Sequence, residues 1–261
     1  MRRRSKYLCV SVVNSHAPIL NIHDLDAIFP DNNGGLQALD RLSFLVCPQE
    51  FVCVLGPSGS GKSTLLRILA GLLRPTSGTV VFAGGERPRI GMVFQQANLM
   101  PWRTVIENIT LPLELEGVNN EAARVKAQEL IDLVGLQGFE DNWPRDLSGG
   151  MAQRVAIARA LIHDPDILLL DEPFGSLDAL TRERMGAELS RIWQARRKTV
   201  IMVTHSISEA LFLADRVLVL TARPGHVKLD LKVDLPRQRK EEMRYTAQFG
   251  KLARKLKGAI G

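Results

Sequence analysis

The sequence predicts an α/β fold in which helices cover a mainly parallel sheet and a helical segment interrupts the order of strands. Short runs rich in Val, Ile and Leu alternate with segments of helical period, a pattern typical of parallel sheets. One such run leads directly into a glycine-rich turn and then a helix, and between about residues 98 and 160 strand patterns give way to helical ones. With 261 residues, one α/β domain with an inserted piece fits the length best.

The first clear strand covers residues 51–55, an uninterrupted apolar run that indicates a buried strand. Apolar residues at positions 65, 66, 69 and 72 then form a helical stripe, which predicts a helix over 62–72. Turn-forming residues at 74–78 close this helix, and residues 79–83 have the composition of a strand.

The second half of the chain begins with helices and then returns to strands. Apolar residues share one face of the segment 121–134, which predicts an amphipathic helix. Beyond residue 160 the expected strands cover 167–170, 199–203 and 216–220, with helices over 180–196 and 207–213 between them.

Membrane and cysteine patterns limit the possible environments. No stretch approaches the roughly 18 to 20 consecutive apolar residues that a spanning helix needs, so a role at a membrane requires a partner. The cysteines, Cys9, Cys47 and Cys53, are odd in number and lack C-x-x-C spacing. We therefore expect buried thiols rather than a disulfide or a metal site, and a reducing cytoplasm.

The net charge of +6 is concentrated at the two ends of the chain. Residues 226–261 hold ten Lys or Arg against four Asp or Glu, and the first six residues add a second basic cluster. We interpret residues 1–18 as a basic arm and residues 226–261 as a basic tail. Basic ends would suit an anionic membrane surface or nucleic acid, but solvated tails are the simpler interpretation.

A phosphate-binding loop follows the first strand. Its sequence fits G-x-x-x-x-G-K-[ST] in the strand-to-helix context that this motif requires. Glycines let backbone N–H groups and the helix N-terminus face an anion, which an ordinary Gly-Ser loop need not do. We expect Lys62 to reach the β and γ phosphates and the Ser63 hydroxyl to coordinate Mg²⁺. The predicted binding residues are Gly56, Pro57, Ser58, Gly59, Ser60, Gly61, Lys62, Ser63 and Thr64.

An acidic pair ends the predicted strand 167–170. In the presence of a phosphate loop, Asp171 is placed to hold Mg²⁺ directly or through water. Glu172 is the natural general base for the water that attacks the γ phosphate. Taken alone, such a pair is more often a turn with helix N-cap character.

The segment Leu147-Ser148-Gly149-Gly150-Met151 opens a predicted helix that runs to about residue 162. It resembles the signature sequence of the ATP-binding cassette proteins, the ABC ATPases, with Met151 where glutamine is commoner. The chemistry fits an anion site, because Ser148 caps the helix while Gly149 and Gly150 expose N–H groups.

Further positions match the family once it is suspected. Gln95 resembles its Q-loop glutamine, which implies a place near the metal and the attacking water. Asp178 resembles the D-loop at the dimer boundary, and His205 resembles the switch histidine that hydrogen-bonds the γ phosphate. Phe29 is the candidate for stacking on adenine, with packing in the N-terminal sheet as the alternative. No guanine-reading N-K-x-D motif is present, so ATP is preferred over GTP.

The resemblance covers about residues 19–225 and implies a P-loop NTPase, RecA-like core with an N-terminal antiparallel β region. It divides the ABC ATPase domain, residues 19–261, into a core of about 19–96 and 163–225, an inserted helical subdomain of about 97–162, and the basic tail. It also implies a head-to-tail dimer with two composite sites. In each site, Ser148 and Gly150 of one copy close over the γ phosphate held by Lys62 of the other.

Segments 100–104, 171–182 and 235–239 resemble the importer subgroup for nitrate, aliphatic sulfonates and taurine. This resemblance implies an ATPase subunit at the cytoplasmic face of the cell membrane, bound to integral membrane permease subunits. A substrate-binding protein would serve it indirectly, and no nucleic acid is expected as a partner. An exporter or lipoprotein-extruding ATPase would share every catalytic motif. A non-transport ABC protein acting on DNA or ribosomes is a third class, but such proteins usually carry two cassettes or long coiled-coil inserts.

Overall fold

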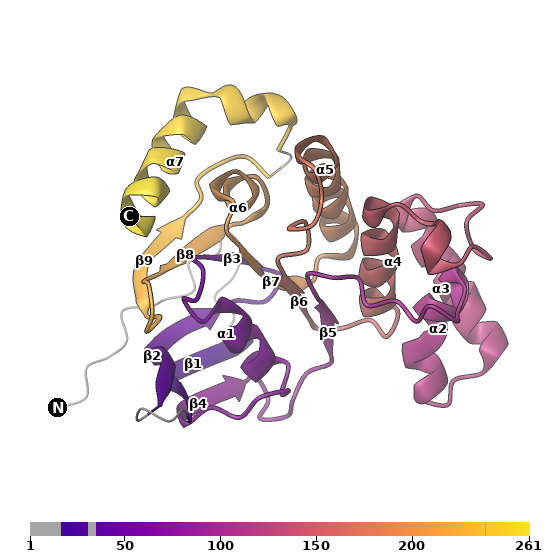
Figure 1. The fold of residues 1–261 in the computed structure, drawn as a ribbon, viewed down its shortest axis with the longest axis horizontal. Coiled ribbons are helices and arrows are strands. Elements are labelled where there is room, and N and C mark those ends of the chain that lie inside the picture. The colour runs from indigo at the N-terminus through magenta and orange to yellow at the C-terminus, as the bar shows by residue number, and fades with distance from the viewer. Residues whose placement is uncertain (1–16, 31–34, 238) are drawn as a thin grey trace. The chain divides into compact units, whose positions relative to one another are not determined.

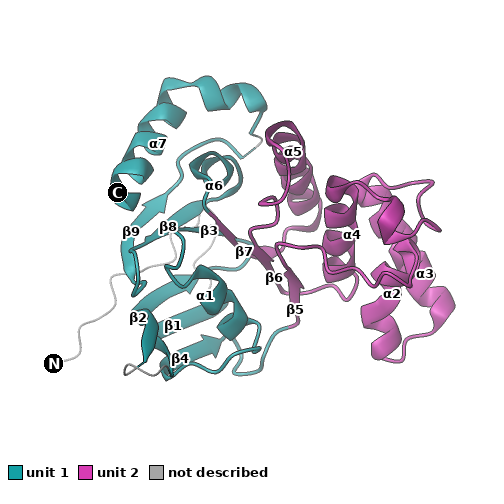
Figure 2. Ribbon diagram, in the orientation of Figure 1, with its two compact units in different colours: residues 1–88, 205–261 teal, residues 89–204 magenta. Residues whose placement is uncertain are grey.

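The computed structural model describes residues 17–30, 35–237 and 239–261, and its fold is mixed α/β (Figure 1). The chain forms two compact units (Figure 2): residues 1–88 with 205–261, and residues 89–204. Most of the predicted basic arm, including Cys9, lies outside the described residues, as does the turn at 31–34.

The first unit contains an antiparallel sheet with the strand order β2-β1-β4. The strands are β1 (Leu20–Phe29), β2 (Leu36–Val46) and β4 (Ser77–Phe82). Ile22 of β1 lies opposite Phe44 on one side and Val80 on the other. Ile22 and Phe44 are both buried, so this sheet has a core-facing side. The predicted N-terminal antiparallel β region is confirmed.

The first unit also holds β3 (Phe51–Leu55), which runs parallel to β8 (Arg216–Leu220). All five residues of β3 are buried, as its continuous apolar sequence predicts. Helix α1 (Lys62–Leu69) follows and ends three residues earlier than predicted. The apolar period continues to Leu72, but Gly71 takes a left-handed conformation that ends the helix.

The C-terminal part of the first unit is more structured than a basic tail. After α6 (Ile207–Leu213) and β8, strand β9 (Val227–Lys232) pairs antiparallel with β8. A short helix, η2 (Glu241–Tyr245), leads to α7 (Ala247–Ile260), which packs on α6 and β8 (Figure 1). Two apolar side chains of α7, Phe249 and Leu256, are buried. Charge composition alone did not reveal these elements.

The second unit contains a parallel group of strands in the order β5-β6-β7. They are β5 (Ile90–Val93), β6 (Ile167–Asp171) and β7 (Thr199–Thr204), and helix α5 (Ala179–Arg196) connects the last two. Every residue of β6 and β7 is buried, which accounts for their apolar sequences. The strands predicted at 167–170 and 199–203 and the helix predicted at 180–196 are confirmed, whereas β5 was not predicted.

Helices form the rest of the second unit. They are α2 (Val105–Leu115), α3 (Asn120–Val134), η1 (Pro144–Asp146) and α4 (Gly149–Leu161). Helices α2, α3 and α4 pack against one another (Figure 1). The predicted segment 97–162 lies entirely within this unit, and its limits as a subdomain stay a prediction.

The structure bears on the predictions made from the apolar segments and from the cysteines. No helix within the described ranges is both long enough and apolar enough to cross a membrane. Cys53 is a buried free thiol, as predicted, and burial raises its pKa well above the usual value. Cys47 is also buried but is disulfide-bonded, so the prediction of a free thiol there is wrong. Cysteine number and spacing do not reveal which sulfur atoms the fold brings together.

Candidate functional site

The loop 56–64 joins β3 to α1 in the first unit. Lys62 is 6% exposed, and its ammonium donates hydrogen bonds to the carbonyl oxygens of Gly56 (3.0 Å) and Pro57 (2.9 Å). The loop therefore curves around the ammonium at the start of α1. The first turn of α1 contains no acidic residue, so the positive end of the helix dipole is not opposed there. This curved backbone with a buried cation is suited to a phosphate chain.

Any residue other than glycine would be strained at position 61. The Gly61 φ of +83° is left-handed, and a Cβ at this position would lie 2.6 Å from both Ala38 O and Leu39 Cδ2. Both the dihedral angle and the close approach require glycine. The sequence motif predicted a tight turn here, and β2 supplies the backbone against which the turn is pressed.

A second loop, residues 221–226 between β8 and β9, supports the phosphate loop from outside. The Arg223 Nε donates to the Gly59 carbonyl oxygen at 3.3 Å, and the Gly225 N–H donates to Ala38 O at 2.9 Å. Sequence reasoning missed this support. The Arg-Pro-Gly turn between two strands is the only signal that could have indicated it.

His205 and Phe29 also belong to the first unit. His205 is exposed and directly precedes Ser206, whose hydroxyl caps α6 by accepting the Glu209 N–H. Phe29 ends β1 opposite Leu36 and is 36% exposed, so its ring is not fully packed into the sheet. Their roles toward a nucleotide stay predictions.

The acidic pair lies at the carboxyl end of β6 in the second unit. Asp171 is 8% exposed, and Glu172 follows with a φ of 45°, in the left-handed region. Such a conformation costs a glutamate about 1–2 kcal/mol and is typical of functional positions. A Cβ on Gly175 would lie 3.1 Å from Gln95 Nε2 and 3.5 Å from Glu172 Oε2. The structure thus brings the Gln95 and Glu172 side chains to the same glycine.

Helix α4 holds the segment that carries Gln95. Its Gln153 donates to Phe94 O at 3.2 Å, and its Arg159 donates to Ala97 O at 2.7 Å and Asn98 O at 2.9 Å. Burial lowers the pKa of Arg159. Neither Gln153 nor Arg159 was assigned a role from sequence, since nothing local to them indicates a partner some 60 residues away.

The signature segment begins α4 as predicted. The Ser148 hydroxyl accepts the Met151 N–H at 3.3 Å, and Ser148 and Gly149 are both exposed. Gly149 and Gly150 face the start of α5, where a Cβ on Gly150 would lie 3.1 Å from Thr181 Cγ2. Asp178 caps α5 by accepting the Thr181 N–H, and hydrogen bonding to Thr181 lowers its pKa.

The predicted metal ligands come from both units, Ser63 from the first and Gln95 and Asp171 from the second. Within the described ranges, no group of three or more His, Cys, Asp or Glu side chains could hold a metal ion. The predicted Mg²⁺ ligands cannot count as such a group, because two of them, Ser63 and Gln95, are not His, Cys, Asp or Glu.

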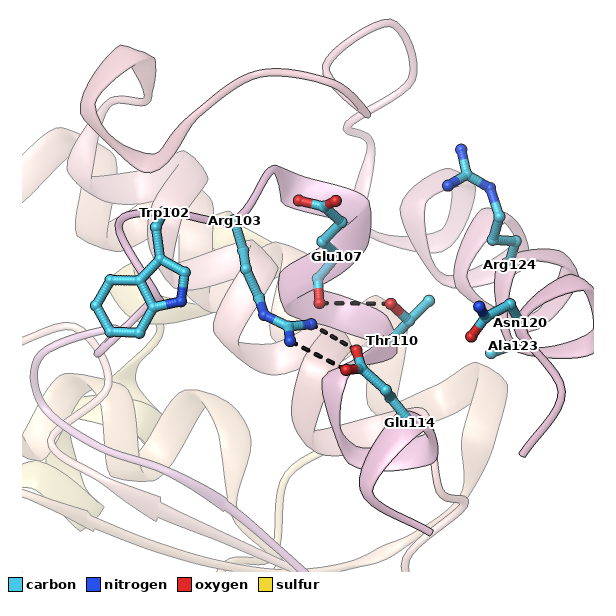
Figure 3. A pocket seen from close by; sticks show the side chains of 8 residues that line it. All are labelled: Trp102, Arg103, Glu107, Thr110, Glu114, Asn120, Ala123 and Arg124. Carbon is cyan, nitrogen blue, oxygen red and sulfur yellow. Dashed lines mark hydrogen bonds and ion pairs between the residues drawn. The ribbon is translucent and has the colours of Figure 1, made fainter. Parts of the chain in front are cut away.

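A pocket of about 520 Å³ lies in the helical part of the second unit (Figure 3). Two of its lining residues, Arg103 and Glu114, make a two-pronged ion pair at 2.5 and 3.1 Å. This hydrogen bonding lowers the pKa of Glu114 and raises that of Arg103. The indole of Trp102 beside it is 69% exposed. The lining residues are Trp102, Arg103, Glu107, Thr110, Glu114, Asn120, Ala123 and Arg124.

Comparison with solved structures places the fold. The chain matches an ATP-binding cassette, MJ0796, in a dimeric post-hydrolysis state bound to ADP and Pi, with a TM-score of 0.72 and 34% identity. The match covers 83% of this chain and 100% of that one. A second dimeric structure of the same bacterial ABC transporter cassette matches with a TM-score of 0.73 and 35% identity.

Sequence relatives agree with this match. An uncharacterized ABC transporter ATP-binding protein of Methanocaldococcus jannaschii is 53% identical over 225 residues, 84% of each chain. The nitrate import ATP-binding protein NrtD of Synechocystis is 47% identical, covering 83% of each chain. The aliphatic sulfonates import ATP-binding protein SsuB of Bacillus cereus is 42% identical, covering 85% of this chain and 90% of that protein. The ABC transporter family model matches residues 39–175. The chain therefore belongs to the ABC transporter family, as an ATP-binding protein.

Proposed function

We propose that this protein is the ATP-hydrolysing subunit of an ABC importer for a small anion of the nitrate, sulfonate or taurine type. The observation that carries the proposal is the loop 56–64, whose backbone curves around the buried Lys62 ammonium at an unopposed helix N-terminus. The importer assignment is supported by the relatives, which are named for nitrate and for aliphatic sulfonate import. An exporter ATPase and an ATPase acting on nucleic acid are the alternatives.

In the proposed site the Lys62 ammonium exchanges its carbonyl contacts for the β and γ phosphates, and the N–H groups of the loop hold the same oxygens. Phe29 stacks on the adenine. Ser63, Gln95 and Asp171 are the residues that would hold Mg²⁺, which when bound neutralises phosphate charge. Their hydroxyl, amide and carboxylate oxygens suit this hard cation.

Glu172 accepts a proton from the attacking water, and Gln95 helps to orient that water. The convergence of both side chains on Gly175 supports this division of roles. His205 donates a hydrogen bond to the γ phosphate.

We further propose that ATP joins two copies head to tail. The exposed Ser148 and Gly149 at the start of α4 leave this helix N-terminus open to an anion from another molecule. Asp178, at the start of α5, belongs to the segment packed against this corner. Both matched solved cassettes are dimers. ATP would then favour the closed dimer by mass action, and hydrolysis would release it.

The partner proposed for the pocket of Figure 3 is a cytoplasmic segment of an integral membrane permease. Trp102, which lines this pocket, is 69% exposed, so a large apolar side chain lies next to the Arg103–Glu114 ion pair. The proposal therefore includes a location for the protein at the cytoplasmic face of the cell membrane. A substrate-binding protein outside the membrane would supply the anion.

The first test is Glu172→Gln, with Glu183→Gln on the exposed side of α5 as the matched control. Without the base, the Glu172→Gln variant should bind ATP, fail to hydrolyse it, and elute as a dimer on a sizing column. The Glu183→Gln variant should hydrolyse ATP at the wild-type rate. A Glu172→Gln protein that remains monomeric at saturating ATP contradicts the dimer model.

The second test separates the transport alternatives. The protein is purified with its permease, placed in vesicles and supplied with the substrate-binding protein. Movement of labelled nitrate or taurine from the side that holds the binding protein to the side that holds the ATPase supports import. Movement in the opposite direction supports an exporter. Hydrolysis stimulated by DNA or RNA in the absence of any permease would favour the nucleic-acid class.

A further inference from the structure

The segment that follows β9 carries three arginines, and each contacts α6 or one of the two residues that follow it. Arg237, Arg239 and Arg244 belong to the stretch between β9 and α7, about 30 residues beyond α6 in sequence. We call them the arginine clamp. The family match ends at residue 175, so it gives these side chains no role.

Arg239 is the most buried member, at 8% exposure. Its Nη1 donates to the carbonyl oxygens of Leu211 and Ala214, both at 2.7 Å, and its Nε donates to Pro236 O at 3.2 Å. Leu211 and Ala214 belong to the last turn and C-cap of α6, whose carbonyls lack partners within the helix. A buried cation at this negative end of the helix satisfies them directly. Burial lowers the pKa of Arg239 to about 10, so it stays charged at neutral pH.

The other two arginines contact different parts of the same helix. The Arg244 guanidinium lies 4.3 Å from the centre of the Phe212 ring, and its Nη1 donates to the Ser208 hydroxyl in the first turn of α6. Arg237 forms an ion pair with Asp215, the residue after the C-cap Ala214. The clamp therefore contacts the first turn of α6, its last turn with the C-cap, and the residue that follows the C-cap.

The helix needs such support because it is only seven residues long. Helices of this length are not stable alone in water, so tertiary contacts determine where they lie. His205 directly precedes Ser206, the residue that caps the start of α6. The position and direction of α6 therefore help to determine where the backbone of His205 lies, together with β7, which ends at the preceding residue.

We propose that the arginine clamp positions His205 for ATP hydrolysis, with Arg239 as its principal positioning residue. The inference rests on the proposed role of His205 and extends it to the C-terminal segment. It predicts that the segment 235–245 affects the hydrolytic step while leaving nucleotide binding by the loop 56–64 unchanged. The C-terminal segment is then part of the catalytic support, and a ligand or protein that displaced it would slow hydrolysis.

The test measures kcat, KM for ATP and melting temperature for the full-length Arg239→Gln and Arg239→Lys variants. Arg254→Gln, the same substitution on the exposed side of α7, is the matched control. We expect Arg239→Gln to lower kcat about tenfold with KM within about twofold of wild type. Arg239→Lys should recover part of the loss, since it keeps the charge but not the planar guanidinium that also donates from Nε to Pro236 O. Arg254→Gln should match wild type.

A double-mutant cycle distinguishes positioning from a general loss of stability. The rate of His205→Ala is compared with that of His205→Ala combined with Arg239→Gln, by single-turnover hydrolysis with enzyme in excess. If Arg239 acts through His205, the second substitution should have little further effect. An equal loss in both backgrounds overturns the inference. Ser208→Ala, which removes one Arg244 contact from the helix side, repeats the cycle with a milder change if Arg239→Gln does not fold.

The outcomes also separate this inference from the proposed function. If His205→Ala hydrolyses ATP at the wild-type rate, the assigned role of His205 is wrong, and the clamp proposal fails with it. If His205→Ala is impaired while Arg239→Gln and Ser208→Ala fold and retain wild-type kcat, the role of His205 stands and the clamp proposal alone is overturned.

Discussion

Replacing Gly61 by alanine should distort the phosphate loop, and the structure allows the cost to be worked out in two parts. The left-handed φ of +83° costs an alanine about 1 kcal/mol relative to glycine. The new methyl group would also lie 2.6 Å from the Ala38 carbonyl oxygen and from Leu39 Cδ2. Relieving such overpacking costs about 1–3 kcal/mol more. The total loss in the free energy of unfolding is therefore about 2–4 kcal/mol.

Gly84→Ala is the matched control, because its φ of +76° is almost the same but an added Cβ meets nothing within 4 Å. It should lose only the conformational part, about 1 kcal/mol. Urea unfolding measures both variants, and titration with ATP measures binding. Gly61→Ala should also bind ATP at least tenfold more weakly, because the methyl group displaces the loop that holds the phosphates. Equal destabilisation by the two variants, with unchanged ATP affinity for Gly61→Ala, would refute the reasoning.

Three further predictions concern stability. The Asn108 side chain is fully buried, donates to Met100 O and Thr104 O, and accepts the Met100 N–H. Asn108→Ala should therefore lower the free energy of unfolding, measured in urea, by about 2–4 kcal/mol. A loss below about 1 kcal/mol would show that water replaces these bonds. Thr104→Ala removes the capping box of α2 and should cost about 1 kcal/mol by the same measurement, and no loss would mean that packing alone fixes the helix start. The Asp26 carboxylate accepts the Arg41 N–H, and this bond is the main reason its pKa is lowered from 3.8. Its folded pKa is the lower one, so Asp26 stabilises the fold above pH 3.8 and loses this effect as the pH falls further; Asp26→Asn should be less stable than wild type at pH 7 and equal to it in strong acid, and a difference independent of pH would contradict this assignment.

The elements that the sequence predicts well are those whose local pattern agrees with their surroundings. Strand β3 and helix α6 have the predicted limits, because a continuous apolar run needs a buried position and a serine caps the helix start. Helix α1 was predicted too long, since periodicity detects an apolar stripe but not the left-handed Gly71 that ends the helix. A strand and a helix, β9 and α7, were hidden within a stretch interpreted by its charge.

The candidate site was predictable where chemistry is local and not where it depends on distant contacts. The loop 56–64 and the Ser148 cap are encoded by adjacent residues, and the structure shows both. The supports were not predictable in the same way. Arg223 reaches Gly59 across 164 positions, and Arg159 reaches Ala97 across 62. Only the fold brings such pairs together, and the same holds for the disulfide at Cys47.

The central claim is that each nucleotide is shared between Lys62 of one copy and Ser148 of another. Mixing two inactive variants tests it: Lys62→Ala in one chain and Ser148→Arg in the other. If the sites are composite, each mixed dimer contains one site in which both residues are intact. Since about half of the dimers are mixed, roughly a quarter of the wild-type ATPase rate should return. If each chain encloses its own nucleotide, both chains remain defective in every combination, and a mixture with no more activity than its separate components would contradict the claim.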